Sequence, residues 1–179
     1  MQNKINDITS TPAAIAQWLP SPCPTDVTAW SSDGATKTTN LFRENTQNIA
    51  HVIYKILGST TPMIAGGLWT AYFEVKPAGR TWVKVAFPRN QKGSWFELSG
   101  DGALGALLST PYARGIQLLD DGYYGIWVSA IASSNQAANG PELYLALADE
   151  GGAYLGDGSS GVNMRLAQVC DGGAPIPLA

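Results

Sequence analysis

Apolar and polar residues alternate along Leu68–Phe87, on both sides of a short break in the middle of the segment. A two-residue period places successive side chains on opposite faces of an extended chain, so the pattern predicts two half-buried β-strands and not a helix. Pro77 and Gly79 are expected to end the first strand, Leu68–Lys76, before the second strand, Thr81–Phe87, begins. We expect both strands in one antiparallel sheet. The core face of the first strand would carry Trp69, Ala71, Phe73 and Val75.

Segments of similar character recur along the chain. The twenty glycines and eleven prolines are spread between them, as short strands joined by turns require. This organisation predicts an all-β protein built as an antiparallel two-sheet sandwich. The other expected strands are Val27–Trp30, Asn40–Glu44, His51–Leu57, Ser94–Leu98, Ala103–Leu108, Gly115–Leu119, Tyr123–Ala132, Leu143–Ala148 and Val162–Val169. The expected core includes Phe73, Val75, Val83, Val85, Ile126, Val128, Leu145 and Leu147.

Three segments carry a resemblance to a known family. They read FEVKPAGRTWVKVAF from Phe73, LLDDGYYGIWVSA from Leu118 and AYLGDGSSGVNMRLAQV from Ala153. In pattern, order and spacing they resemble the jelly-roll domains of bacteriophage virion proteins, of the carbohydrate-binding-module-like (concanavalin-like) type found in tail fibres and other virion surface proteins. The resemblance covers roughly Asp26 to Val169. It implies a jelly-roll fold and, more loosely, a place in a virion.

Residues 1–24 differ in composition from the rest of the chain. Three prolines follow Trp18 within six residues, so this segment is expected to run extended as an N-terminal arm, ahead of a jelly-roll sandwich at 25–170 and a tail at 171–179. An isolated arm buries apolar side chains poorly, so a groove on a neighbouring subunit is the expected acceptor. The candidate interface residues are Ile8, Ile15, Trp18 and Leu19.

Charge and apolar content exclude several partners. A net charge of −3 with 14% charged residues leaves no basic surface, so no nucleic-acid partner is expected. The sequence has no run of eighteen apolar residues that could span a membrane, and its N-terminus is a poor signal peptide. We expect the protein to be made in the host cytoplasm and to reside in the virion. Cys23 and Cys170 are then two free thiols, and a disulfide between them is the alternative.

No pattern points to catalysis. His51, the only histidine, lies in an expected strand beside Val52 and Ile53 and is interpreted as structural. The sequence contains no GxSxG, HExxH, CxxC or phosphate-loop motif, and we expect a protein that is not an enzyme. A glycosidase pair among the carboxylates is the weaker alternative.

A glycine-rich loop bracketed by Asp149, Glu150 and Asp157 is the place where calcium could bind, as it sometimes does in jelly rolls of the resembled kind. Two simple glycine turns are the favoured interpretation. No metal-ligand set is assigned and no cofactor is expected.

Six tryptophans and seven tyrosines make the best case for ligand binding. Sugar rings stack their apolar faces on flat aromatic side chains, and polar neighbours bind the hydroxyls. Packing in the core or between protomers is the competing explanation for each residue. The candidate glycan-binding residues, on strand faces opposite the most aliphatic ones, are Tyr72, Trp82, Lys84, Trp127 and Tyr144.

Two functions follow from these observations. The first is a non-catalytic bacteriophage virion structural protein, a capsid decoration (cement) protein or a tail or fibre component. It would form homo-oligomers, with a trimer expected before a dimer, and anchor to neighbouring virion subunits. The alternative is a carbohydrate-binding adhesin that recognises host-surface glycans.

Overall fold

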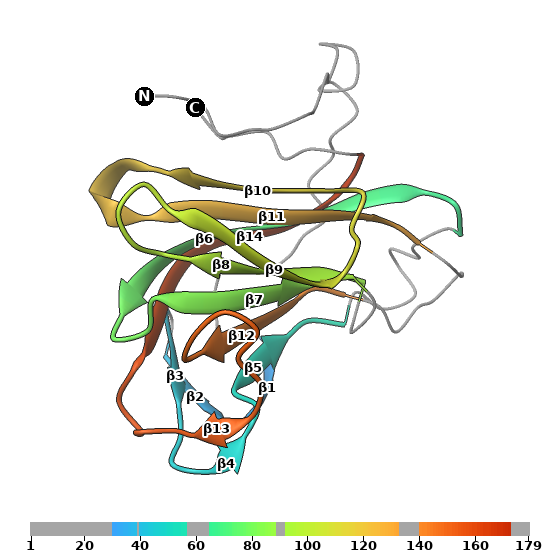
Figure 1. Cartoon of the computed structure of the whole chain (residues 1–179). Helices are drawn as coiled ribbons and strands as arrows, with labels where there is room; N and C mark the ends of the chain where they lie inside the picture. The colour runs from blue at the N-terminus through green and yellow to red at the C-terminus, as the bar shows by residue number, and fades with distance from the viewer. Residues whose placement is uncertain (1–29, 39, 57–64, 89–91, 133–139, 173–179) are drawn as a thin grey trace.

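The computed structural model describes residues 30–38, 40–56, 65–88, 92–132 and 140–172. Within these ranges the chain is all-β, and its only helical element is a 3-10 turn at Asp120–Gly122. Every strand pair in the described part is antiparallel, and the strands form two large sheets and one small one (Figure 1). The expected all-β class with antiparallel sheets is therefore confirmed.

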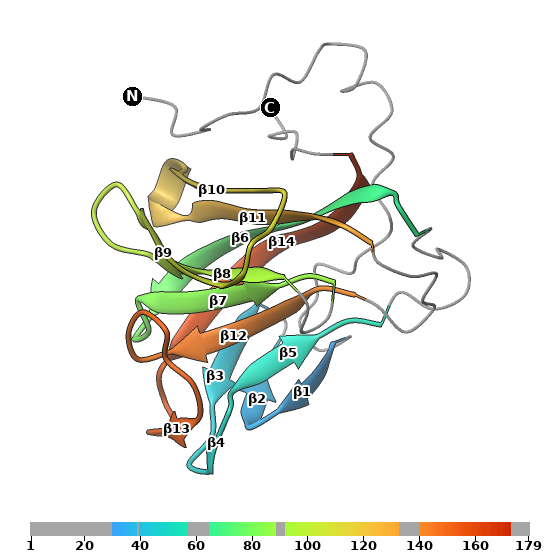
Figure 2. The same cartoon turned by 45° about the vertical axis from the view of Figure 1, so that its right-hand side comes forward.

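The first large sheet, here called the β7 sheet, has six strands (Figure 2). Their order is β1 (Ser31–Asp33), β5 (Val52–Tyr54), β12 (Glu142–Ala146), β7 (Trp82–Ala86), β8 (Gly93–Glu97) and β9 (Ala103–Ser109).

The second large sheet, here called the β6 sheet, also has six strands. Their order is β10 (Ala113–Leu118), β11 (Tyr124–Ile131), β6 (Leu68–Ala78), β14 (Gly161–Asp171), β3 (Leu41–Glu44) and β2 (Ala35–Lys37). A short pair, β4 (Asn48–Ile49) with β13 (Tyr154–Leu155), lies at one end of the molecule (Figure 1).

The apolar core lies between the two large sheets. Both contribute fully buried side chains, for example Phe73 from β6 and Val85 from β7. Seven of the eight expected core residues are buried there. The eighth, Leu147, is 55% exposed, because β12 ends at Ala146 and the chain turns away from the core. The expectation for Leu147 is wrong.

The two strands of Leu68–Phe87 do not share a sheet. β6 pairs with β11 and β14, whereas β7 pairs with β12 and β8. The chain crosses between the sheets at Gly79, whose φ of +99° favours glycine. A Cβ at Gly79 would also lie 2.7 Å from Ser160 Oγ. The expectation of one sheet is wrong, since alternation identifies strands but does not choose their partners.

Pro77 does not end β6, which continues to Ala78. The last residue of β6 that pairs with β11 is Val75, while Pro77 pairs with Val162 of β14. Past Val75 the strand has one neighbour instead of two, and the missing amide hydrogen of proline is tolerated at such an edge position.

Four short strands, β1, β2, β4 and β13, were not expected from the sequence. Each has two or three residues, too few to show a two-residue period. Conversely, all of the expected strand Val27–Trp30 except Trp30 lies outside the described residues, as does the whole arm.

A buried carboxylate joins the β6 sheet to the crossover and to β13. Glu44 Oε2 accepts hydrogen bonds from Arg80 Nε at 2.7 Å and from the Tyr154 hydroxyl at 2.6 Å. Its Oε1 accepts from Arg80 Nη2 and from the amide of Asp157, both at 2.6 Å. Burial alone would raise the pKa of Glu44, but the hydrogen bonds and the Arg80 charge outweigh it and lower that pKa. The Glu44 carboxylate is therefore ionised, and each of its oxygens accepts two hydrogen bonds.

Candidate ligand-binding face

Three of the five candidate glycan-binding residues lie together on the outer face of the β7 sheet. Trp82 and Lys84 alternate with core residues along β7, and Tyr144 on β12 pairs with Lys84. On the other side of β7, Lys84 pairs with Trp95 of β8. The row Tyr144–Lys84–Trp95, with Trp82 two residues from Lys84, defines what we call the Lys84 face.

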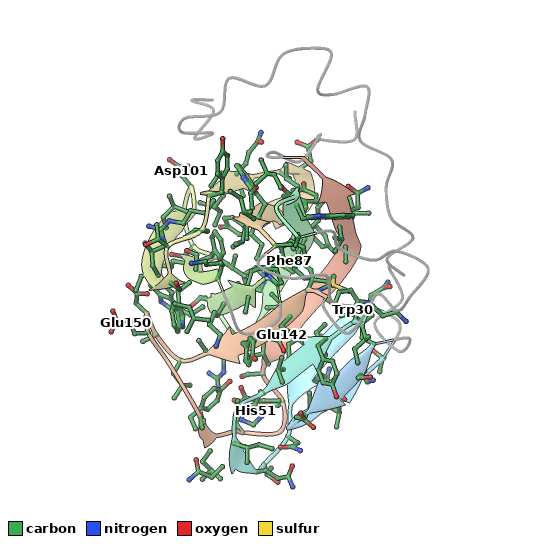
Figure 3. The ribbon with its side chains drawn as sticks, turned by 90° about the vertical axis from the view of Figure 1, so that its right-hand side faces the viewer. Trp30, His51, Phe87, Asp101, Glu142 and Glu150 are labelled. Carbon is green, nitrogen blue, oxygen red and sulfur yellow. The ribbon has the colours of Figure 1, made fainter. Side chains whose placement is uncertain are left out.

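The Lys84 ammonium lies over two aromatic rings of this face. Its Nζ is 3.6 Å from the centroid of Tyr144 and 5.3 Å from that of Trp95, so both contacts are within cation–π range. Burial lowers the pKa of Lys84, and the charge of Glu142 opposes this effect. Glu142, which is labelled in Figure 3, is buried. It accepts a hydrogen bond from the Tyr144 hydroxyl at 3.0 Å. The partly exposed side chains of Trp82, Lys84 and Tyr144 thus lie beside the buried carboxylate of Glu142 and the buried ring of Trp95.

The turn after β12 borders the Lys84 face. The indole Nε1 of Trp95 donates to the carbonyl of Gly151 at 3.3 Å, and Asp149 Oδ1 accepts from the amide of Ala106 on β9 at 2.7 Å. Gly105 leaves room for the ring of Trp82, since a Cβ there would lie 2.7 Å from Trp82 Cζ3. These contacts hold the aromatic side chains in fixed positions, as a binding face requires.

The other two candidates, Tyr72 and Trp127, lie on the outer face of the opposite sheet. They are paired on β6 and β11, and both are buried. The ring of Trp127 covers Gly115, and that of Tyr72 covers Gly125. The structure therefore does not unite the five residues in one site, because β6 and β7 belong to different sheets.

The Tyr72 hydroxyl donates to Glu74 Oε1 at 2.9 Å, and Glu74 Oε2 accepts from Arg165 Nε at 2.5 Å. Burial first, and then the Glu74 charge, raise the pKa of Tyr72. The guanidinium of Arg165 lies 4.3 Å from the centroid of Tyr123. Tyr72 is therefore a member of a structural network on the β6 sheet.

Trp95 of the Lys84 face and Glu142 beside this face were not expected from the sequence. Trp95 lies in GSWFE, where it alternates with the core residue Phe96, and Glu142 is the first residue of β12. The alternation was visible in both strands. Their position beside Lys84 depends on sheet order, which the alternation does not contain.

The three acidic residues considered for calcium already have protein partners or lie exposed. Asp157 Oδ1 accepts from the amides of Ser159 and Ser160, and its Oδ2 accepts from the Ser160 hydroxyl. These hydrogen bonds, with that of the Ser160 hydroxyl first, lower the pKa of Asp157. Asp149 is bound to β9 as described above, and Glu150 is exposed. Among the residues that the structure describes, no group of three or more His, Cys, Asp or Glu side chains could hold a metal ion.

His51 is fully buried directly before β5. Both ring nitrogens contact backbone carbonyl oxygens: Nδ1 is 2.5 Å from Gly34 O, and Nε2 is 3.1 Å from Tyr154 O. These contacts agree with a structural histidine.

The candidate interface residues Ile8, Ile15, Trp18 and Leu19 lie outside the described residues, and so does Cys23. No helix long and apolar enough to cross a membrane occurs in the described ranges. No protein-family model matches the chain, and no curated protein matches it.

Proposed function

We propose that this protein is a non-catalytic structural protein of a bacteriophage virion, a jelly-roll sandwich that forms homo-oligomers and anchors to neighbouring subunits through its N-terminal arm. Within the described residues, the observation that supports this proposal is the edge strand β9.

β9 reads ALGALLS and contains neither charge nor proline, although it ends the β7 sheet. Edge strands of monomeric proteins are usually protected by charges, prolines or a covering element. Three leucines of β9 are 37% to 42% exposed: Leu104, Leu107 and Leu108. Half-exposed leucines gathered on one edge are typical of a surface that another protein covers.

The middle of β9 is not free to add another strand. Arg114 Nη1 donates to the carbonyl of Gly105 at 2.5 Å, and Asp149 accepts from the amide of Ala106. β8 and β9 also pair irregularly around this point. The contact that we propose therefore uses the leucine side chains and not a continuous backbone ladder.

Light scattering of the purified chain tests the oligomer. The wild-type protein should show two or three times the 18.9 kDa of one chain, and Leu107→Lys should reduce the mass toward one chain because a charge in an apolar contact is costly. The matched control is Leu155→Lys at the other end of the molecule, which should leave the mass unchanged. A monomeric wild-type protein at assembly-like concentration would refute the proposal.

Deletion of residues 1–20 tests the arm. The truncated chain should melt like the full one but should no longer be incorporated into particles. Incorporation at normal copy number would remove the anchoring role and favour the second candidate.

That second candidate is glycan recognition on the Lys84 face, and the gathering of Trp82, Lys84, Tyr144 and Trp95 there supports it. A glycan array should detect binding that Trp82→Ala reduces by roughly tenfold or more, the effect of losing about 1.4 kcal/mol of stacking. Lys76→Ala on the β6 sheet is the control and should bind as wild type does. An array with no signal for the wild-type chain would eliminate this candidate.

A further inference from the structure

Two charged side chains from other elements hold the middle of the edge strand β9, which has no charge of its own. They bind both polar atoms of the peptide group between Gly105 and Ala106. Its carbonyl oxygen accepts from Arg114 Nη1 at 2.5 Å, and its amide donates to Asp149 Oδ1 at 2.7 Å. Arg114 lies on β10 of the opposite sheet, and Asp149 lies in the turn after β12, which Glu150 marks in Figure 3. We call this arrangement the β9 clamp.

The backbone of β9 is irregular at the clamp. Leu104 and Leu107 are three residues apart, but their partners on β8 are only two residues apart. One extra residue therefore lies in β9 within this interval, as in a β-bulge, which leaves part of a strand outside the regular ladder. The Gly105–Ala106 peptide group lies in the same interval, and the clamp gives it its hydrogen-bond partners.

Arg114 is held in place by further hydrogen bonds. Its Nη1 also donates to the hydroxyl of the buried Ser94 at 2.6 Å and to the carbonyl of Ala106 at 3.2 Å. Arg114 pairs with the core residue Val128, so its side chain leaves β10 on the inner side of the sheet. It therefore closes the side of the sandwich on which β9 and β10 end the two large sheets (Figure 2).

Asp149 reaches the backbone of β9 because residue 105 is a glycine. A Cβ on Gly105 would overlap Asp149 Oδ1. The same oxygen accepts from the amide of Glu150 at 3.1 Å, which fixes the direction of the carboxylate. The charges of the clamp are thus brought to β9 by two other segments of the chain.

An edge strand offers a row of N–H and C=O groups that can pair with another strand, and natural edges are commonly blocked by charges or bulges. The β9 clamp supplies both devices to a strand whose own residues are apolar or small. The partner that such an edge fits is β9 of a second copy, because two edges of identical sequence can pair antiparallel around a two-fold axis.

We propose that the β9 clamp prevents the β9 strands of two copies from pairing into one continuous sheet. Arg114 and Asp149 occupy a C=O and an N–H in the middle of the edge, and they hold the strand in its bulged form. The inference concerns the backbone of β9, and it holds whether or not the leucine side chains join copies of the wild-type chain.

Asp149→Ala tests the clamp, because it removes an exposed side chain and frees the Ala106 amide. In light scattering of the full chain, the variant should show at least about twice the mass of wild type at the same concentration. Hydrogen exchange of the associated variant should show β9 amides on the order of tenfold better protected than in wild type, the effect of a new backbone hydrogen bond. Asp149→Asn keeps an oxygen acceptor and should behave as wild type does.

Arg114→Leu frees the other half of the clamp and should associate in the same way. Leu145→Ala is the control for loss of stability, because it weakens the core and leaves the clamp intact. An unchanged mass for Asp149→Ala would overturn the proposal. So would association without protection of β9, or equal association of Leu145→Ala. The mass of the wild-type chain tests the proposed oligomer separately, so the two ideas can fail independently.

Discussion

Replacing Glu44 with Gln should destabilise the protein strongly. The carboxylate is fully buried and accepts four hydrogen bonds, two of them from Arg80. Glutamine keeps the shape but carries no charge, and its amide group turns a donor toward other donors. Arg80 then loses its main counter-ion in a place where its side chain is only 18% exposed.

The magnitude follows from that burial. Breaking a buried ion pair by removing one partner costs about 3–5 kcal/mol. Because Arg80 retains some solvent contact and lies 3.3 Å from Asp157, the lower end, about 3 kcal/mol, is expected. In a chain of this size, each kcal/mol lowers the melting temperature by roughly 2–4 °C, so a decrease of about 6–12 °C should follow.

Guanidinium unfolding followed by tryptophan fluorescence gives the free energy directly. The matched control is Glu97→Gln on β8, where the carboxylate accepts a hydrogen bond from the exposed Ser99, and it should stay within about 0.5 kcal/mol of wild type. A loss below about 1 kcal/mol for Glu44→Gln would refute the view that this cluster joins β3, β13 and the crossover.

The same variant has a pH signature. The pKa of Glu44 in the folded protein lies below its ordinary value of 4.5. The stability it contributes is therefore fully present above about pH 4.5 and is lost as pH falls through the folded pKa. The gap in unfolding free energy between wild type and Glu44→Gln should accordingly be constant near neutral pH and shrink in acid. A gap that grows in acid would contradict the assignment.

Three further substitutions test the packing. Val85→Asp should prevent folding, because an unpaired charge in the core costs several kcal/mol, and a soluble, cooperatively melting variant would disprove the core assignment. Leu145→Ala should lower the free energy of unfolding by about 2–5 kcal/mol, because Leu145 is buried. Leu147→Ala should lower it by less than about 0.5 kcal/mol, because Leu147 is exposed. Equal losses in chemical unfolding would contradict the end of β12 at Ala146. Gly115→Ala should cost about 1–3 kcal/mol because its methyl group enters the space of the Trp127 ring, and an unchanged melting temperature would show that the ring can move aside.

The alternation of apolar and polar residues was sufficient to predict much of the fold. Residues two apart in a strand share a face whatever the strand pairs with, so the core positions of β6, β7 and β11 follow from alternation alone. The same reasoning placed Trp82, Lys84 and Tyr144 on outward faces. It went wrong at Leu147, because alternation continues in the sequence past the residue at which β12 ends.

Tertiary structure decided what alternation leaves open. Whether β6 and β7 are neighbours depends on which strands each can pair with across the whole chain, and this choice puts Tyr72 and Trp82 on opposite sides of the sandwich. The contacts of Glu44 with Arg80 and of His51 with Tyr154 join residues 36 and 103 positions apart. A two-residue period carries no information about contacts between residues so far apart in the sequence. The sequence alone determined the class of fold and which side chains face inward. The tertiary structure decided the order of strands in each sheet. That order in turn determines which residues form the Lys84 face and which partners the buried charges have.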